Sequence, residues 1–206
     1  MNKMVKVDES QVSNGAEETL AASVPYVIRV ELEGTVPIIF HRYNCDSVEA
    51  KSKAAKGSAA KKTDDIESYV YRNDKREICI PGRYVIGSIV NAAKYKQDPR
   101  SPRKSAMDLF KAGVVALTEL ASLGSQKWDY EDRQPVQVQR SRIARVRPAM
   151  KPGWKASFDL MVHLPEYIPP VLLRQVLDDA GRLVGIADFR PTYGRFVVRA
   201  WAPAIK

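Results

Sequence analysis

The densest group of chemically useful side chains lies between positions 133 and 155. This stretch reads RQPVQVQRSRIARVRPAMKPGWK and contains no acidic residue. The whole chain has 33 Lys and Arg against 24 Asp and Glu, and seven of the nine excess positive charges fall in this basic run. Clustered cations release counterions from a nucleic-acid backbone, so we favour phosphate binding over a basic surface without a ligand or one that faces an acidic protein. The seven cations are Arg133, Arg140, Arg142, Arg145, Arg147, Lys151 and Lys155.

A second candidate phosphate site is the segment 185–194, which reads GIADFRPTYG. Its glycines expose backbone N–H groups beside Arg190 and close to Arg195, and such groups form anion sites together with arginines. The Tyr193 ring can stack on a base. The simpler alternative is that glycine and proline only close a turn while Phe189 fills the core, and for Phe189 we favour the core. Neither G-x-G-x-x-G nor GK followed by Ser or Thr occurs, so the segment is not a dinucleotide or P-loop site.

The tripeptide His41-Arg42-Tyr43 follows the first expected strand and allows two interpretations. In the first, His41 acts as a general base on an RNA 2′-hydroxyl while Arg42 holds the phosphate. In the second, which we favour, the tripeptide is a polar edge that contacts ligand or solvent. His163 alternates onto the outer face of a strand and is expected at the surface.

Trp154 stands next to Lys155 and either stacks on a base or belongs to the core, and the sequence does not separate these alternatives. The sequence contains no evident pair of catalytic carboxylates and no Ser-His-Asp or Cys-His arrangement. We therefore expect a protein without catalytic residues, cofactor or metal.

Composition limits the class of protein further. A chain of 206 residues with 45% hydrophobic residues is long enough for one domain with a sizeable core. No apolar run approaches the ~20 residues that span a bilayer, and the first 23 residues lack the apolar segment of a secretory signal. Cys45 and Cys79 fit no disulfide or metal framework, so we expect reduced thiols in a cytoplasmic protein with no membrane contact.

The expected elements divide the chain into a flexible arm over 1–23 and a single domain over 24–206, with a mobile insertion at about 46–65. Alternating apolar residues predict strands over 26–33, 77–80 and 195–201. Proline-led apolar faces predict helices from 82 to about 95 and from 169 to about 180. A short helix to 111 and a strand over 113–120 are expected between them.

The basic run itself alternates like a strand, and so do residues 154–162. With a turn at 148–153, these segments predict a long basic hairpin over about 134–163. In order, the elements give strand, helix, strand, hairpin strands, helix and strand. This order is typical of an α+β, ferredoxin-like (RRM-like) sandwich, an antiparallel sheet with two helices on one face. RNA-recognition modules bind nucleic acid on the open face of such a sheet.

Three segments together resemble the RAMP superfamily, the ferredoxin-like RNA-binding proteins of CRISPR effector complexes. They read YVIRVELEGTVPIIFHRYN, ICIPGRYVIGSIVNAAKY and GRLVGIADFRPTYGRF and span most of the chain after residue 24. The likeness is greatest to the backbone subunit that coats the guide RNA, or to a short phage-encoded relative. It implies binding of single-stranded RNA, copies of the protein along the strand, and other effector-complex subunits as partners. Residues 140–155 match the thumb that this family inserts between bases.

The chain is shorter than a full backbone subunit and its loop has fewer glycines than the strict family signature. Two other functions therefore stay open: a metal-independent endoribonuclease that processes guide RNA with His41 as base, and a phage protein that binds or anneals single-stranded DNA. The candidate contacts to single-stranded RNA or DNA are Arg42, Tyr43, Arg140, Arg142, Arg145, Arg147, Lys151, Trp154, Lys155, Arg190, Tyr193 and Arg195.

Overall fold

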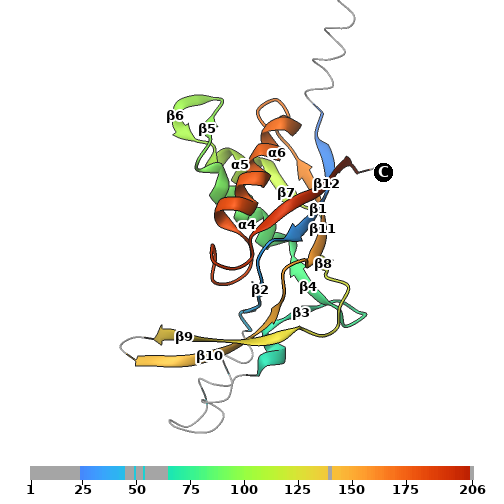
Figure 1. Ribbon diagram of the computed structural model, residues 1–206. Helices are drawn as coiled ribbons and strands as arrows, with labels where there is room; N and C mark the ends of the chain where they lie inside the picture. Colours follow the sequence, from blue (N-terminus) through green and yellow to red (C-terminus); the bar gives the residue numbers. More distant parts are fainter. Residues whose placement is uncertain (1–23, 45–48, 50–52, 54–64, 139–140, 205–206) are drawn as a thin grey trace, which may run out of the picture.

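The computed structural model describes residues 24–44, 49, 53, 65–138 and 141–204, with side chains omitted for 136–143 (Figure 1). The expected flexible arm over 1–23 and most of the expected insertion over 46–65 lie outside these residues. Within the described part of the chain, no helix combines the length and the apolar character needed to cross a membrane.

The central sheet has four strands in the order β12-β1-β11-β7, with every neighbouring pair antiparallel. Helix α4 lies between β1 and β7 in the chain, and α6 lies between β11 and β12. This strand order and these two crossovers define a ferredoxin-like α+β fold and confirm the predicted fold class. The elements are β1 (Tyr26–Gly34), α4 (Gly82–Ala93), β7 (Val114–Ala116), β11 (Lys155–Val162), α6 (Pro170–Asp179) and β12 (Phe196–Pro203).

The core lies between this sheet and the two helices, which cover one of its faces (Figure 1). Alternate residues of β1 and β11 point into it, among them Leu32 and Phe158, because a strand turns successive side chains to opposite faces. Helix α4 contributes Val85 and Ile89 at helical spacing, and both are fully buried. At the first residue of the helix, Gly82, a side chain has no room, because an added Cβ would lie 2.2 Å from the Thr118 carbonyl oxygen.

The open face of the sheet is lined by ion pairs. Arg29 on β1 pairs with Asp159 on β11 at 2.7 Å, and Arg199 on β12 pairs with Glu33 at 2.9 Å. Aromatic rings are absent from the side chains that β1 and β11 turn toward this face, so the base-stacking platform of an RNA-recognition module is missing there. These side chains are Val27, Arg29, Glu31, Glu33, Lys155, Ser157, Asp159 and Met161.

A two-stranded hairpin projects from the domain (Figure 1). It consists of β9 (Tyr130–Val138) and β10 (Ser141–Met150), which pair along their whole length. The predicted pairing of 134–147 with 154–163 is wrong, because β10 pairs with β9, with Val138 opposite Ser141. The reason is that β11 buries every second residue against the core and pairs with β1 and β7, so it cannot also be a hairpin strand. The predicted turn at 148–153 is found in its second half, at Pro152 and Gly153, while residues 148–150 continue strand β10.

The remaining elements support the hairpin and the start of α4. The predicted strand over 113–120 is split, since β7 joins the central sheet and β8 joins a second sheet with β3 and β4. A short tongue formed by β5 and β6 follows α4. The elements are β2 (Ile38–Ile39), η1 (Ile66–Tyr69), β3 (Tyr71–Arg72), β4 (Ile78–Pro81), β5 (Gln97–Asp98), β6 (Ser101–Ser105), α5 (Met107–Gly113), β8 (Leu120–Ser122) and the π-helical turn η2 (Ala180–Val184).

Candidate nucleic-acid interface

The segment 185–194 forms the tight loop that its composition predicts. Gly194 has a φ of +74°, and an added Cβ would lie 1.8 Å from the Ile186 carbonyl oxygen, so only glycine fits. The Ile186 N–H donates to Gly194 O at 2.9 Å, and the Gly194 N–H donates to Pro37 O at 2.8 Å. These bonds hold the loop against the chain segment that leads from β1 into β2.

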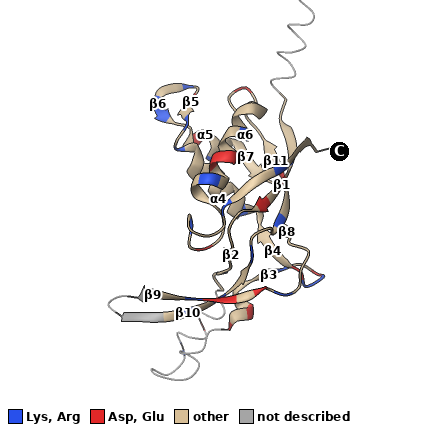
Figure 2. Ribbon diagram, viewed as in Figure 1, with Lys and Arg blue, Asp and Glu red and all other residues tan. Residues whose placement is uncertain are grey.

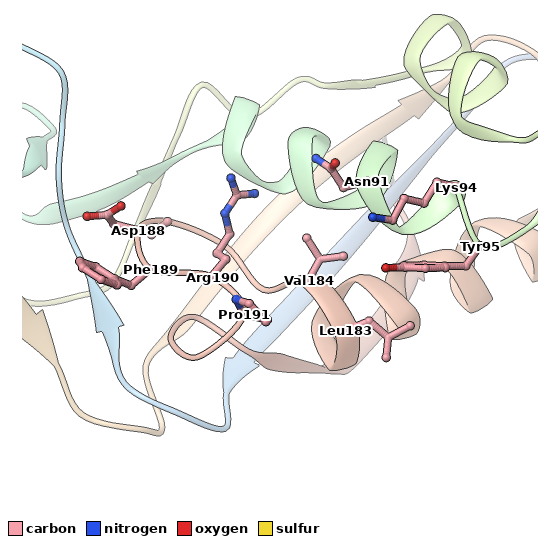
Figure 3. Close-up of a pocket in the computed structure, with 10 residues that line it drawn as sticks. Asn91, Lys94, Tyr95, Leu183, Val184, Asp188, Phe189, Arg190 and Pro191 are labelled. Carbon is pink, nitrogen blue, oxygen red and sulfur yellow. The ribbon is translucent and has the colours of Figure 1, made fainter. Parts of the chain in front are cut away.

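A cleft of about 520 Å³ lies between this loop and the C-terminal end of α4 (Figure 3). We call it the loop cleft. Lys94, Asn91 and Tyr95 line it from α4 and the turn that follows, and Arg190 lines it from the loop. Among the described residues, neither Lys94 nor Arg190 forms an ion pair with a carboxylate, although Asp188 lies at the rim. The loop cleft therefore presents two positive charges with no carboxylate partner in that part of the chain.

Arg147, at the base of the hairpin, is buried. The whole residue is 5% exposed. Its Nε lies 2.8 Å from Asp188 Oδ2, although the two atoms lack hydrogen-bond geometry. Its guanidinium lies 4.6 Å from the centre of the Phe189 ring. Burial lowers the pKa of Arg147, while the charge of Asp188 opposes this shift. Arg147 thus ties the hairpin to the loop, and its predicted phosphate contact does not fit its position.

The ring of His41 lies between Asp188 and a second hairpin residue, Arg145. His41 Nδ1 lies 3.6 Å from Asp188 Oδ2, and His41 Nε2 lies 3.3 Å from Arg145 Nη1. Because arginine can only donate, Nε2 is the acceptor and the ring proton is on Nδ1, which faces the carboxylate. Burial raises the pKa of the Asp188 carboxyl, but the contact with His41 and the charge of Arg147 outweigh this and hold it below its ordinary value.

Tyr193 is also committed to the hairpin. Its hydroxyl donates to Asp132 Oδ2 at 3.1 Å and accepts from Gln134 Nε2 at 3.1 Å. Phe189, predicted to fill the core, is 37% exposed instead, because the loop turns it outward against Arg147 and the edge of Tyr193. Figure 2 shows the acidic residues at the start of β9 that bring negative charge to the stem.

Trp154 belongs to the core. Of its two predicted roles, core packing therefore fits the structure and base stacking does not. Trp154 is 4% exposed, its Nε1 donates to Val36 O at 3.0 Å, and its ring packs so closely on Gly34 that no Cβ fits there. Neighbouring Lys155 is 60% exposed at its side chain, with its Nζ 3.8 Å from Glu33 and 4.0 Å from Glu31.

The other predicted contacts are distributed over the surface. Arg195 is exposed and its Nε donates to Pro191 O at 2.8 Å. Lys151 and Tyr43 are exposed, and Tyr43 is 71% accessible. Arg140 and the side chain of Arg142 lie outside what the structure describes.

Arg42 lies apart from the contacts of His41 with Asp188 and Arg145. Its guanidinium lies 5.0 Å from the centre of the Tyr71 ring, near Arg83 at the start of α4. The sequence reasoning missed Arg83 and Lys94, which are eleven residues, or three turns, apart and so share one face of α4. That spacing was the signal that could have identified them.

The described side chains include no group of three or more His, Cys, Asp or Glu residues that could hold a metal ion. Cys79 is buried with a free thiol, while Cys45 lies outside the described residues.

Comparison with known proteins places the fold. No family model matches the sequence, and no curated protein matches it. Among solved structures, the fold is similar to that of a chain in the cryo-EM structure of the Type III-B Cmr-beta bound to cognate target RNA. The similarity has a TM-score of 0.53 and 12% identity and covers 96% of this chain and 68% of that chain. The protein thus shares its fold with a chain of that structure.

Proposed function

We propose that the protein binds single-stranded nucleic acid, with RNA as the first candidate, through the phosphate backbone and without catalysis. The observation that carries this proposal is the loop cleft, which Arg190 and Lys94 line with no carboxylate partner among the described residues, Lys94 Nζ lying 4.8 Å from the centre of the Tyr95 ring. Guanidinium and ammonium groups in this situation bind phosphate oxygens through charge-assisted hydrogen bonds. The fold shared with a chain from an RNA-bound CRISPR complex supports RNA as the polymer.

Backbone contacts of this kind are tolerant of sequence and sensitive to salt. The same proposal includes copies of the protein along one strand, as in CRISPR backbone subunits, and contacts with other subunits of an effector complex. The projecting hairpin supports this arrangement, since β9 and β10 extend beyond the domain that holds the loop cleft (Figure 1). Neighbouring copies would then meet through the hairpin.

Equilibrium binding of labelled single strands over a salt series tests the function. If about five phosphates are neutralised, log affinity falls with log salt with a slope of about −3.5. RNA and DNA of one sequence are compared in parallel, and tighter DNA binding together with strand annealing would favour the phage alternative. A slope near zero on both polymers would exclude backbone binding.

A second candidate is a metal-independent ribonuclease, and one observation favours it: the Asp188 carboxylate faces His41 Nδ1 as an orienting group faces a general base. Against it, Arg145 lies against Nε2, the nitrogen that would take the proton. Labelled RNA is incubated with wild type and with His41→Ala in the presence of a chelator. Cleavage that the substitution abolishes would establish the ribonuclease.

A further inference from the structure

The outward face of α4 connects the loop cleft with a second basic cleft. Arg83, Gly87, Asn91 and Lys94 are spaced three or four residues apart and follow this face from the first turn of the helix to its end. Arg83, Asn91 and Lys94 are exposed, and no acidic residue occurs anywhere in the helix. The face therefore has a positive charge at each end and none of the i, i+4 acid partners that usually neutralise such charges.

The second cleft lies at the start of α4 and has a volume of about 540 Å³. We call it the tyrosine cleft. The guanidinium groups of Arg42 and Arg83 lie 5.0 and 5.3 Å from the centre of one ring, that of Tyr71, and Arg83 also hydrogen-bonds the Tyr71 hydroxyl. Glu119 lines the cleft too, but neither arginine forms an ion pair with it or with another described carboxylate.

Arg42 and Arg83 bring two like charges to one aromatic ring and to one cleft. The ring offsets little of their mutual repulsion, since an exposed cation–π contact contributes about 0.5–1 kcal/mol. An anion bound in the cleft lowers this repulsion and accepts hydrogen bonds from the guanidinium N–H groups. A phosphate accepts several such donors at once, which makes it the matching ligand.

Gly87 lies midway between the clefts and has no packing function. Apart from the helix's own backbone, an added Cβ at this position would have no heavy atom within 4 Å. Glycine is unfavourable inside a helix, and here neither a close neighbour nor a positive φ requires it. The absence of a side chain keeps the middle of the face low, and the Asn91 amide, which donates to Gly87 O at 2.7 Å, is the polar group that a ligand would meet there.

We propose that one single strand lies along the outward face of α4, with one phosphate in the tyrosine cleft, another in the loop cleft, and the connecting nucleotides over Gly87. This inference rests on the proposed nucleic-acid binding and adds the path of the strand. From Arg83 to Lys94 the helix rises about 16 Å, at about 1.5 Å per residue. About five stacked nucleotides, at about 3.4 Å each, cover that distance.

The test uses the full chain and a labelled RNA of about twelve nucleotides, longer than the path requires. Arg83→Gln should weaken binding about three- to tenfold and reduce the magnitude of the salt slope by about 0.7, the value for one phosphate contact on a single strand. Arg103→Gln is the matched control, because Arg103 is exposed on β6, has no ion pair among the described residues, and lies outside the path. Equal slopes for the two variants would overturn the path.

A second pair of variants probes the middle of the path. Gly87→Ala adds one methyl group and should leave binding within about twofold of wild type, whereas the longer side chain of Gly87→Gln should obstruct the strand and weaken binding at least fivefold, by our estimate of about 1 kcal/mol. Circular dichroism and thermal unfolding confirm that both variants fold. Unchanged binding by Gly87→Gln would place the strand elsewhere.

RNA with and without a 5′-phosphate separates an internal phosphate from a terminal one. The proposed path predicts the same loss for Arg83→Gln on both RNAs. A loss confined to the 5′-phosphorylated RNA would assign the tyrosine cleft to the end of a strand and overturn the path. If wild type itself binds neither RNA in a salt-dependent manner, the proposed function fails before the path is tested.

Discussion

Two basic regions of the protein differ in what their charges contact. In the basic run 133–155, Arg147 is buried against Asp188, Arg145 lies against His41, and Lys155 lies near two glutamates. On α4 and the adjoining loop, Arg83, Lys94 and Arg190 form no ion pair with a described carboxylate. In the region with the higher density of positive charge along the sequence, these three described cations therefore already contact groups of their own chain.

A segment that contains no acidic residue in its sequence can still have acidic neighbours in the folded protein. The basic run contains no acid, yet Asp188 and Glu33 reach it from distant segments once the chain folds. Helix α4 also contains no acid, and although Asp188 and Glu119 line the clefts at its two ends, neither forms an ion pair with Arg83 or Lys94. Its cations therefore stay available for phosphate.

Trp154→Ala should have the largest effect and should act on stability. Removing a fully packed indole from a core costs about 4 kcal/mol, and the bond from Nε1 to Val36 O is lost as well. Urea unfolding measures the change, and Trp154→Phe serves as the milder control. Weak RNA binding by a variant of normal stability would instead assign Trp154 to base stacking and break the comparison.

Asp188→Asn should destabilise the protein by about 3 kcal/mol, because it leaves the buried charge of Arg147 without its partner. The folded-state pKa of Asp188 is below its ordinary value, so its contribution is complete above about pH 4 and declines as the pH falls through the lower folded pKa. The stability gap between wild type and variant should stay constant from about pH 5 to 8 and narrow below about pH 4. A gap that widens in acid would contradict this role.

Lys94→Gln combined with Arg190→Gln should weaken RNA binding about tenfold, or about 1.4 kcal/mol, and reduce the magnitude of the salt slope by about 1.4. Both residues are exposed and neither forms an ion pair among the described residues, so stability should stay within about 0.5 kcal/mol of wild type. Salt-series binding and thermal unfolding provide the two readouts. A fall in stability without a change in the salt slope would show that Lys94 and Arg190 stabilise the fold and do not bind RNA.

Lys155→Gln should have the smallest effect, a change in RNA affinity of less than about twofold, because exposed ion pairs such as its contacts with Glu31 and Glu33 are weak and already occupy the ammonium. The same salt series compares it with the double variant. A loss as large as that of Lys94→Gln with Arg190→Gln would show that the basic run carries the ligand after all.

Much of the fold follows from local pattern. The alternation over β1 and β12, the proline-led starts of α4 and α6, and their order along the chain predict the α+β sandwich that the structure shows. The hairpin was misplaced because β11 alternates as regularly as β9 and β10, and alternation does not say which strand a segment pairs with. Burial decides the pairing. Strand β11 buries every second residue in the core and pairs there with β1 and β7.

The candidate site divides in the same way. The glycines and proline of 185–194 predict a tight turn, and the composition predicts a surplus of positive charge on the surface. Which cations remain without an ion pair depends on carboxylates brought from distant segments, so it is known only from the folded chain. Coulomb interactions act over a few ångströms in space and are indifferent to distance along the chain.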